Sequence, residues 1–245
     1  MDDTTIIIPV YQPGDRLEPL VRELSDADTR ILVIDDGSTE GTGVFSRLAD
    51  IRGVAVLRHA VNRGKGAALK TAFAAVLADP QDTAAVVTAD GDGQHLAEDI
   101  FAVAAAAKAN PCAVTLGVRT FSGKIPFRSR LGNLWTETEF RLLTGRRIAD
   151  TQTGLRGIPI GLLPRFAALK GERYEYESRM LVAAALLPSP PVEIPISTIY
   201  LDGNATSHFR PLRDTLLTQS ALIGETWSRR TGPRSPDGSS GSSPL

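Results

Sequence analysis

The sequence predicts an α/β protein in which helices cover both faces of a mostly parallel sheet. Short apolar, β-branched runs alternate with helical segments over the first 119 residues, the pattern of parallel strands joined by helices. Strands buried on both faces give near-continuous apolar runs, as at 5–10, 31–34 and 84–88. Polar or acidic residues follow three of these strands, and ligands of such sheets bind beyond the carboxyl ends of the strands.

The individual elements follow from the apolar spacing and from the turn residues between them. The expected strands span residues 5–11, with its exit at Pro9, then 30–35, 54–57, 84–88, 113–119 and 192–200. Helices are expected at 16–24, around 45–48, and at 67–78, 97–109, 131–143, 180–187 and 211–229. The segment 150–157 is predicted to be a polar turn. Glu172, Glu175 and Glu177 are predicted to be only helix-start charges, which the helix dipole favours.

The bulk composition is that of an ordinary globular protein. With 22% charged residues and a formal net charge of −1, the chain has no overall attraction to nucleic acid or to an anionic membrane. The single cysteine, Cys112, rules out an internal disulfide. The acidic N-terminus does not resemble a signal peptide, and no run of 18 or more apolar residues could span a membrane. We therefore expect a cytoplasmic protein.

The pattern of the sequence changes twice along the chain. After residue 120 a basic loop replaces the regular alternation of strands and helices, and from residue 231 the chain is rich in Ser, Gly and Pro. A length of 245 residues suits one large domain. We expect a single domain over 1–230, made of halves 1–119 and 120–230, followed by a disordered tail at 231–245.

The segment from Asp90 to Gln94 is the strongest candidate for chemistry. A buried strand leads directly into Asp90-Gly91-Asp92-Gly93-Gln94, and an unpaired buried charge is costly. Magnesium binds one or two carboxylates together with substrate phosphates, so a metal–diphosphate site would offset that cost. An ordinary Asp-Gly turn is an equal alternative for these residues alone. The polar exits at Tyr11 and Asp35 favour the metal site, because they converge on the same edge.

Two basic segments could bind phosphate. Lys65, in Asn62-Arg63-Gly64-Lys65-Gly66, does not fit a P-loop, which requires Ser or Thr after the lysine. It could still meet a diphosphate as a point charge beside a helix N-terminus, or be a solvated loop lysine. Arg119, Lys124, Arg128 and Arg130 lie within twelve positions. Guanidinium groups suit phosphate, although a solvated basic loop explains them nearly as well.

The last predicted helix, at 211–229, has two alternative roles. Leu212, Leu216, Ile223 and Trp227 lie near one face, with arginines close by. A basic amphipathic helix that contains tryptophan can lie at a membrane interface. Packing against the domain is the commoner role of an apolar stripe.

Four motifs in order resemble the family 2 glycosyltransferases, whose A-type fold has a Rossmann-like sheet. They are Ile8–Tyr11, Val33–Thr39, Asn62–Gly66 and Asp90–His95, within a likeness that spans about residues 4–225. Gln94, the spacing from Asp150 to Gly154 and the segment Ser207–Arg210 are similar to the dolichol-phosphate mannosyltransferase and polyprenyl-phosphate glycosyltransferase branch. The first half of the chain would then bind the nucleotide-sugar and the second half the acceptor.

The resemblance implies a role for each matching residue. A nucleotide-sugar, linked to UDP or GDP, would contact Pro9, Tyr11, Asp35, Asp36, Lys65 and Asp90. The Mg²⁺ or Mn²⁺ cofactor would be held by Asp90, Asp92 and Gln94. The acceptor phosphate would be bound by Arg119, Arg130, His208 and Arg210. Asp150 is the implied catalytic carboxylate, which acts as a base toward a hydroxyl acceptor but as an orienting group toward a phosphate acceptor.

The expected function is metal-dependent, inverting transfer of a sugar from a nucleotide-sugar to polyprenyl phosphate at the inner face of the membrane. Gln12-Pro13 stands where many relatives have Asn-Glu, and a Ser/Gly/Pro tail stands where close relatives continue into transmembrane helices. We therefore expect peripheral attachment, through the 211–230 helix and a separate membrane protein, or a different acceptor. The alternatives are transfer to a soluble hydroxyl acceptor and a non-catalytic, nucleotide-sugar-binding partner of a membrane protein.

Overall fold

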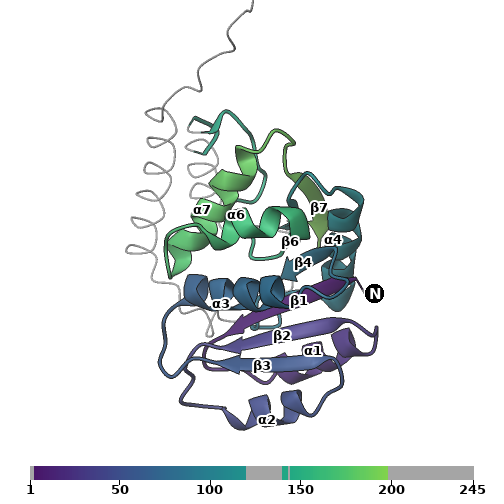
Figure 1. The fold of residues 1–245 in the computed structure, drawn as a ribbon, viewed down its shortest axis with the longest axis vertical. Coiled ribbons are helices and arrows are strands. Elements are labelled where there is room, and N and C mark those ends of the chain that lie inside the picture. Colours follow the sequence, from purple (N-terminus) through teal and green to yellow (C-terminus); the bar gives the residue numbers. More distant parts are fainter. Residues whose placement is uncertain (1–2, 120–139, 143, 198–245) are drawn as a thin grey trace, which may run out of the picture.

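The protein is built on a seven-stranded sheet with the strand order β3-β2-β1-β4-β6-β5-β7 (Figure 1). The computed structural model describes residues 3–119, 140–142 and 144–197. The strands are β1 (Thr4–Val10), β2 (Arg30–Asp35), β3 (Val54–Arg58), β4 (Ala85–Thr88), β5 (Thr115–Arg119), β6 (Arg156–Pro159) and β7 (Val192–Ile196). The six expected strands are present, and β6 is an addition.

Strand directions agree with the predicted, mostly parallel sheet. β1 pairs in parallel with β2 and β4, β2 with β3, and β5 with β7. β6 is antiparallel to both neighbours, β4 and β5. The segment 150–157, which we expected to be only a polar turn, therefore ends in the first residues of a buried strand. The sequence did not predict this strand because it contains Gly157 and Pro159, and both residue types are rare within sheets.

Helices cover both faces of the sheet. One face packs on α1 (Leu17–Ser25), α2 (Gly43–Ala49) and α4 (Ala97–Ala109). The other packs on α3 (Lys65–Ala78), α6 (Leu163–Ala167) and α7 (Tyr174–Ala185), which lie together in Figure 1. Successive strand residues point to opposite faces, so Ile6 and Ile8 join the first core and Ile7 the second. The short η1 (Ile160–Leu162) and α6 were not expected, and α7 begins six residues earlier than predicted.

The carboxyl ends of the six parallel strands meet at one edge, as the sequence predicted. β1 extends one residue beyond Pro9, which sits in a central strand although it has no N–H to donate. The carbonyl of Ile7 accepts from Ala89 at 3.0 Å on the β4 side, and that of Val10 accepts from Asp36 at 2.8 Å on the β2 side. Residue 9 therefore faces the β4 side, where the β1–β4 ladder has already ended. Proline is accommodated there because no partner strand is left to receive its N–H.

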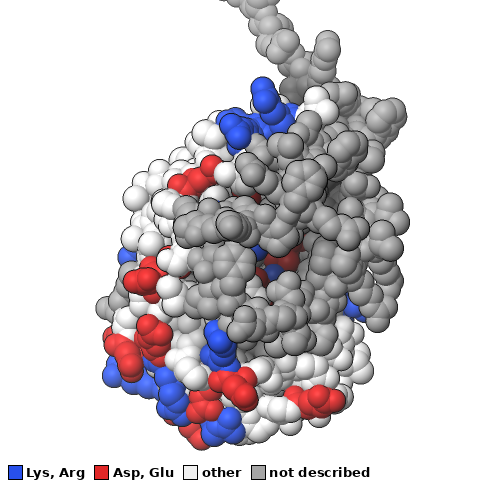
Figure 2. All heavy atoms as spheres, turned by 180° about the vertical axis from the view of Figure 1, so that it is seen from behind, with Lys and Arg blue, Asp and Glu red and all other residues white. Residues whose placement is uncertain are grey.

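Several predictions lie outside the described residues. They are the loop at 120–130, most of the helix at 131–143, the loop at 204–210, the helix at 211–229 and the tail at 231–245. Within the described ranges, no helix is both long and apolar enough to cross a membrane. At the end of the molecule that carries α2 and β3, acidic and basic side chains are interspersed (Figure 2). That end presents no single sign of charge to a partner.

Candidate active site

The turn after β4 carries the acidic motif that the sequence singled out. Asp92 accepts a hydrogen bond through Oδ1 from the backbone N–H of Gln94 at 3.0 Å, so the turn fixes one of its oxygens. Gly93 has a φ of 73°, and a Cβ there would lie 2.5 Å from Cβ of Arg16. Glycine is therefore required for both the conformation and the close approach to α1. The motif is a tight turn, and its shape leaves both aspartates at the strand exit.

Lys65 lies between two carboxylates from distant parts of the chain. Its Nζ is 2.5 Å from Oδ1 of Asp90 and 2.8 Å from Oε1 of Glu177 on α7. His95 Nε2 lies 3.6 Å from the other oxygen of Asp90, a distance that allows a charge interaction but is long for a hydrogen bond. We call Asp90, Lys65 and Glu177 the lysine cluster. The structure thus joins two predicted site residues and adds Glu177, to which the sequence assigned no chemistry.

Burial and charge act in opposite directions on the lysine cluster. Burial would raise the pKa of Asp90, but the Lys65 ammonium and the His95 ring hold that pKa well below its ordinary value. Burial would lower the pKa of Lys65, but Asp90 and Glu177 raise it. Both groups are therefore charged at neutral pH. Burial and the nearby charge of Asp90 raise the pKa of Asp92, so the Asp92 carboxylate would gain from a neighbouring cation.

Asp36 organises the loop that leads to Lys65. Its Oδ1 accepts from the backbone N–H of Arg63 at 3.0 Å, and its Oδ2 accepts from Gly64 at 2.7 Å. The Nδ1 of His59 lies 2.7 Å from the same Oδ1, and the His59 Nε2 lies 2.9 Å from the Thr71 hydroxyl on α3. The Asp36 side chain is 3% exposed, so these protein groups take up the hydrogen-bonding capacity of its carboxylate. The direct contact of Asp36 with a nucleotide stays a prediction.

Asp35 and Gln12 shape the neighbouring exits. Asp35 is fully buried and accepts from the N–H of Ser38 at 2.8 Å, while Arg58 Nε lies 3.0 Å from its other oxygen. Gln12, with a φ of 56°, accepts through Oε1 from the N–H groups of Thr39 and Glu40. Gln12 therefore holds the loop after β2 in place through these hydrogen bonds. Tyr11, the preceding residue, is 37% exposed.

Asp150 and Arg119 form a bidentate ion pair. Arg119 donates from Nε to Oδ2 of Asp150 at 2.6 Å and from Nη2 to Oδ1 at 2.9 Å. Asp150 is 5% exposed, and its Oδ1 also accepts from the N–H of Gln152 at 3.0 Å. The predicted catalytic carboxylate therefore holds the one predicted acceptor-binding arginine within the described residues. Arg130, His208 and Arg210 lie outside the described residues.

The segment after Asp150 reaches the donor side of the site. The Thr88 hydroxyl donates to the carbonyl of Gly154 at 2.9 Å, and a Cβ on Gly154 would lie 2.5 Å from Oδ2 of Asp90. Arg156 is buried and donates from Nη1 to the carbonyl of Glu177 at 2.6 Å. Burial lowers the pKa of Arg156, and the surrounding carboxylates partly offset that effect. Asp90 therefore packs directly on the backbone of Gly154.

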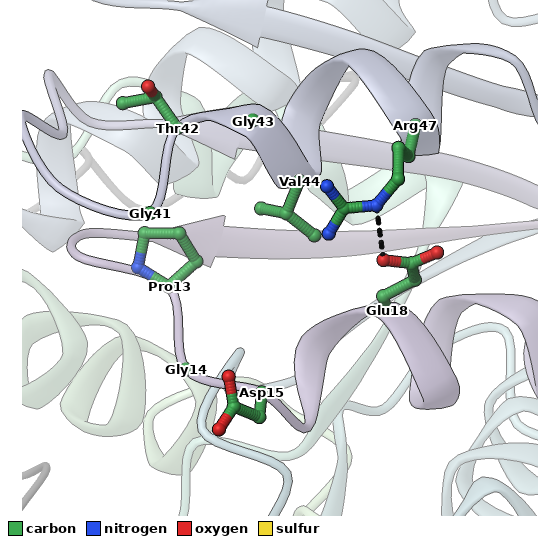
Figure 3. A pocket seen from close by; sticks show the side chains of 9 residues that line it. All are labelled: Pro13, Gly14, Asp15, Glu18, Gly41, Thr42, Gly43, Val44 and Arg47. Atoms are coloured by element: carbon green, nitrogen blue, oxygen red, sulfur yellow. Dashed lines mark hydrogen bonds and ion pairs between the residues drawn. The ribbon is translucent and has the colours of Figure 1, made fainter.

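A surface cavity of about 470 Å³ lies near the exits of β1 and β2 (Figure 3). Three glycines and Pro13 form much of its lining, and Glu18 and Arg47 pair across it at 2.8 Å. None of the residues of the lysine cluster lines it, nor does the Arg119–Asp150 pair. The candidate site is therefore defined by its charged side chains rather than by this cavity.

The donors at the β4 exit fit a divalent cation that is shared with a substrate. Among the described residues, no group of three or more His, Cys, Asp or Glu side chains could hold a metal ion. Asp90 and Asp92 supply carboxylates on one turn, and magnesium commonly binds one or two carboxylates, with water and substrate phosphates completing the set. The site would thus hold a cation together with a diphosphate, and is not complete by itself.

A solved structure matches the fold. Glucosyl-3-phosphoglycerate synthase from Mycobacterium tuberculosis, determined with Mn²⁺, UDP-glucose and phosphoglyceric acid, superposes with a TM-score of 0.63 at 17% identity. The match covers 95% of this chain and 81% of that chain. At this identity the likeness shows the shared A-type fold, which confirms the predicted fold class.

The sequence relatives include named transferases. The chain is 28% identical over 217 residues to UDP-N-acetylglucosamine–dolichyl-phosphate N-acetylglucosaminyltransferase from Methanococcus voltae, covering 80% of this chain and 86% of that protein. It is 28% identical over 205 residues to polyprenol monophosphomannose synthase from Mycolicibacterium smegmatis, covering 79% and 76%. Residues 5–167 match the family model described as "Glycosyl transferase family 2". Since that match spans more than half of the chain, the protein belongs to family 2 and is a glycosyltransferase.

Proposed function

We propose that this glycosyltransferase moves a sugar from a nucleotide-sugar to polyprenyl phosphate, with inversion at the anomeric carbon. The observation that carries the proposal is the bidentate pair between Asp150 and Arg119. Both carboxylate oxygens of Asp150 already accept hydrogen bonds from Arg119, and Oδ1 also accepts from the N–H of Gln152, so they are poorly placed to take a proton from an acceptor hydroxyl. The pair is suited instead to present an arginine to an anionic acceptor.

The acceptor phosphate needs little activation. A phosphate monoester is already ionised at neutral pH, so its oxygen can attack the anomeric carbon without a base of the enzyme. Positioning and electrostatic stabilisation would then carry most of the rate. Asp150 would orient the Arg119 guanidinium, and the guanidinium would hold the phosphate in line with the bond to the departing nucleoside diphosphate. A single displacement of this kind inverts the anomeric centre.

The donor end would use the turn after β4. Asp90 and Asp92 would hold Mg²⁺ or Mn²⁺, with Gln94 as the third predicted ligand. The bound ion would neutralise charge on the departing diphosphate. Lys65 would add a positive charge at the same diphosphate. The Asp36-bound loop fixes Arg63 and Gly64, and so sets where the lysine side chain starts.

The names of the relatives support a polyprenyl-type acceptor. The Methanococcus voltae enzyme is named for dolichyl phosphate and the Mycolicibacterium smegmatis enzyme for polyprenol. An acceptor with a long lipid chain would require work at a membrane surface, for which the predicted 211–230 helix is the candidate contact. Peripheral attachment, alone or through a separate membrane protein, is part of this proposal.

The test combines purified protein, Mn²⁺, several UDP- and GDP-sugars and a short-chain prenyl phosphate. Release of nucleoside diphosphate that depends on the prenyl phosphate would support the proposal. Binding of nucleotide without turnover toward any acceptor would instead favour a non-catalytic partner of a membrane protein.

Replacing Asp150 with asparagine separates the two catalytic alternatives. With a phosphate acceptor we expect a modest loss of kcat, on the order of tenfold, because Asn retains one acceptor for the Arg119 guanidinium. A hydroxyl acceptor would need Asp150 as its base, and the same substitution would then abolish nearly all turnover. Near-complete loss would therefore reject the phosphate acceptor.

A further inference from the structure

The first turn of α3 packs directly on the start of α7. A Cβ on Gly64 would lie 2.5 Å from the carbonyl oxygen of Glu172, and one on Gly66 would lie 2.5 Å from Cβ of Tyr176. The N–H of Ala67 donates to the same Glu172 carbonyl at 2.8 Å. Only glycine permits so close an approach of the two segments. This packing brings the start of α7 within reach of Lys65, the first residue of α3.

The contact between Lys65 and Glu177 is partly sheltered from solvent. Their side chains are 20% and 14% exposed, and the Lys65 Nζ lies 2.8 Å from Oε1 of Glu177. Arg156, which is buried, donates to the backbone carbonyl of Glu177 at 2.6 Å and so fixes the backbone at this point of α7. An ion pair with this burial is screened less by solvent and salt than an exposed surface pair, and the fixed backbone keeps the Glu177 carboxylate near Lys65.

The two carboxylates beside Lys65 differ in their surroundings. Asp90 belongs to the same turn as Asp92, at the place proposed for the donor diphosphate. Glu177 comes from a helix in the second half of the chain, beyond residues 5–167 of the family match. Lys65 therefore has an anchor that is independent of the acidic turn. The ammonium can stay in place while Asp90 serves another partner.

We propose that Glu177 is a positioning residue that acts through Lys65 and holds its ammonium at the diphosphate of the donor. This inference rests on the proposed function, since the ligand is the nucleoside diphosphate part of the donor. A lysine side chain is long and flexible, and fixing it on binding costs conformational entropy. Because Glu177 already restrains the Lys65 side chain in the folded protein, less entropy is lost on binding. A preorganised group of this kind binds its ligand more tightly.

The test measures binding of UDP and GDP by calorimetry in the presence of Mn²⁺, together with thermal melting. Glu177→Ala should weaken nucleoside diphosphate binding about 3- to 10-fold, the effect of having to immobilise one flexible side chain on binding. Glu177→Gln should recover part of that loss, because its amide oxygen still accepts from Lys65. Glu175→Gln removes a charge from the same turn of α7 and should bind within about twofold of wild type.

Activity adds a second readout. In Glu177 variants the KM for the nucleotide-sugar should rise by a similar factor, and more than kcat falls. A purely structural role of Glu177 would lower the melting temperature without this change in affinity or KM. If Glu177→Ala does not fold, Glu177→Gln carries the comparison, because it keeps the size of the side chain.

Each outcome has one meaning. The inference would be overturned if Glu177→Ala bound nucleoside diphosphate as tightly as wild type or more tightly while Lys65→Ala lost binding. Glu177 would then only neutralise the charge of the lysine and would not position it. Failure of wild-type protein to bind either nucleoside diphosphate would reject the proposed function itself. Weaker binding in Glu177→Ala, partly restored in Glu177→Gln, supports the positioning role.

Discussion

Replacing Gly154 with alanine should disturb the candidate site through a single contact. A Cβ at this position would lie 2.5 Å from Oδ2 and 2.7 Å from Oδ1 of Asp90. The backbone cannot easily retreat, because the carbonyl of Gly154 accepts from the Thr88 hydroxyl at 2.9 Å. Gly154 is not among the glycines with positive φ, so alanine suits the local backbone. The three atoms nearest to the added Cβ all belong to the Asp90 carboxyl group, so the closest conflict is with this side chain.

The size of the effect follows from that overlap. To reach an ordinary contact the carboxylate must move by roughly 1 Å, since nonbonded heavy atoms pack at about 3.5 Å. A shift of this size removes Asp90 from hydrogen-bond range of Lys65, now 2.5 Å away. Losing this hydrogen bond between charged groups costs about 1.5–3 kcal/mol of folding stability. We expect kcat/KM to fall about 100-fold, as for a 1 Å misplacement near reacting groups.

The assay is release of nucleoside diphosphate from the nucleotide-sugar, measured alongside thermal melting. Gly161→Ala is the matched control, because a Cβ on Gly161 meets no atom within 4 Å. Gly161→Ala should melt close to wild type and Gly154→Ala below it, and only Gly154→Ala should lose activity when both are assayed well below their melting temperatures. If the two variants have equal kcat/KM, the contact between Gly154 and Asp90 does not position the carboxylate and the reasoning is wrong.

Three further predictions concern stability and metal. Asp36→Ala leaves the N–H groups of Arg63 and Gly64 without their acceptor, so denaturant unfolding should show a loss of at least about 2 kcal/mol. Burial raises the pKa of Asp99, although the carboxylate accepts a hydrogen bond from the N–H of Ser197. The stability that depends on this carboxyl group is therefore full below its pKa in the unfolded chain and declines as the pH rises through the raised pKa of the folded protein. Asp99→Asn should accordingly melt at a higher temperature than wild type at pH 7 and at the same temperature at pH 3. Chelation by EDTA should abolish turnover, restored by Mg²⁺ or Mn²⁺, yet leave the melting temperature of nucleotide-free protein unchanged, because the described ligands do not complete a metal site.

The sequence predicted those features that depend on local pattern. The apolar runs of β1, β2 and β4 and the helix at 97–109 follow from periodicity, which neighbouring residues determine. The shared edge followed as well, because parallel strands with short connections end together. That argument placed the strand exits at Asp35 and Asp90 on one edge, whereas Asp150 was assigned only through the resemblance to the family 2 glycosyltransferases.

Features that depend on long-range packing were missed. β6 has little strand character of its own, and it is a strand because β4 and β5 lie on either side to pair with it. Glu177 is 112 positions from Lys65 in the chain, and their contact depends on Gly64, just before α3, and Gly66, within it, which both meet the start of α7. His59 was overlooked for the same reason. Its partner Asp36 lies 23 residues earlier, and no spacing rule connects them.

The segment from Asp150 to Arg156 explains why an antiparallel strand interrupts the sheet. It begins with the carboxylate that holds Arg119, continues with the glycine against Asp90, and ends with the arginine that holds the carbonyl of Glu177. A parallel strand between β4 and β5 would start at the opposite edge of the sheet and could not deliver these residues here. Only a reversed strand enters at the carboxyl edge, where the proposed donor and acceptor ends of the site would meet. The reversal of β6 therefore brings the segment 150–156 to that edge, where one short run of backbone contacts Asp90 and carries the partner of Arg119.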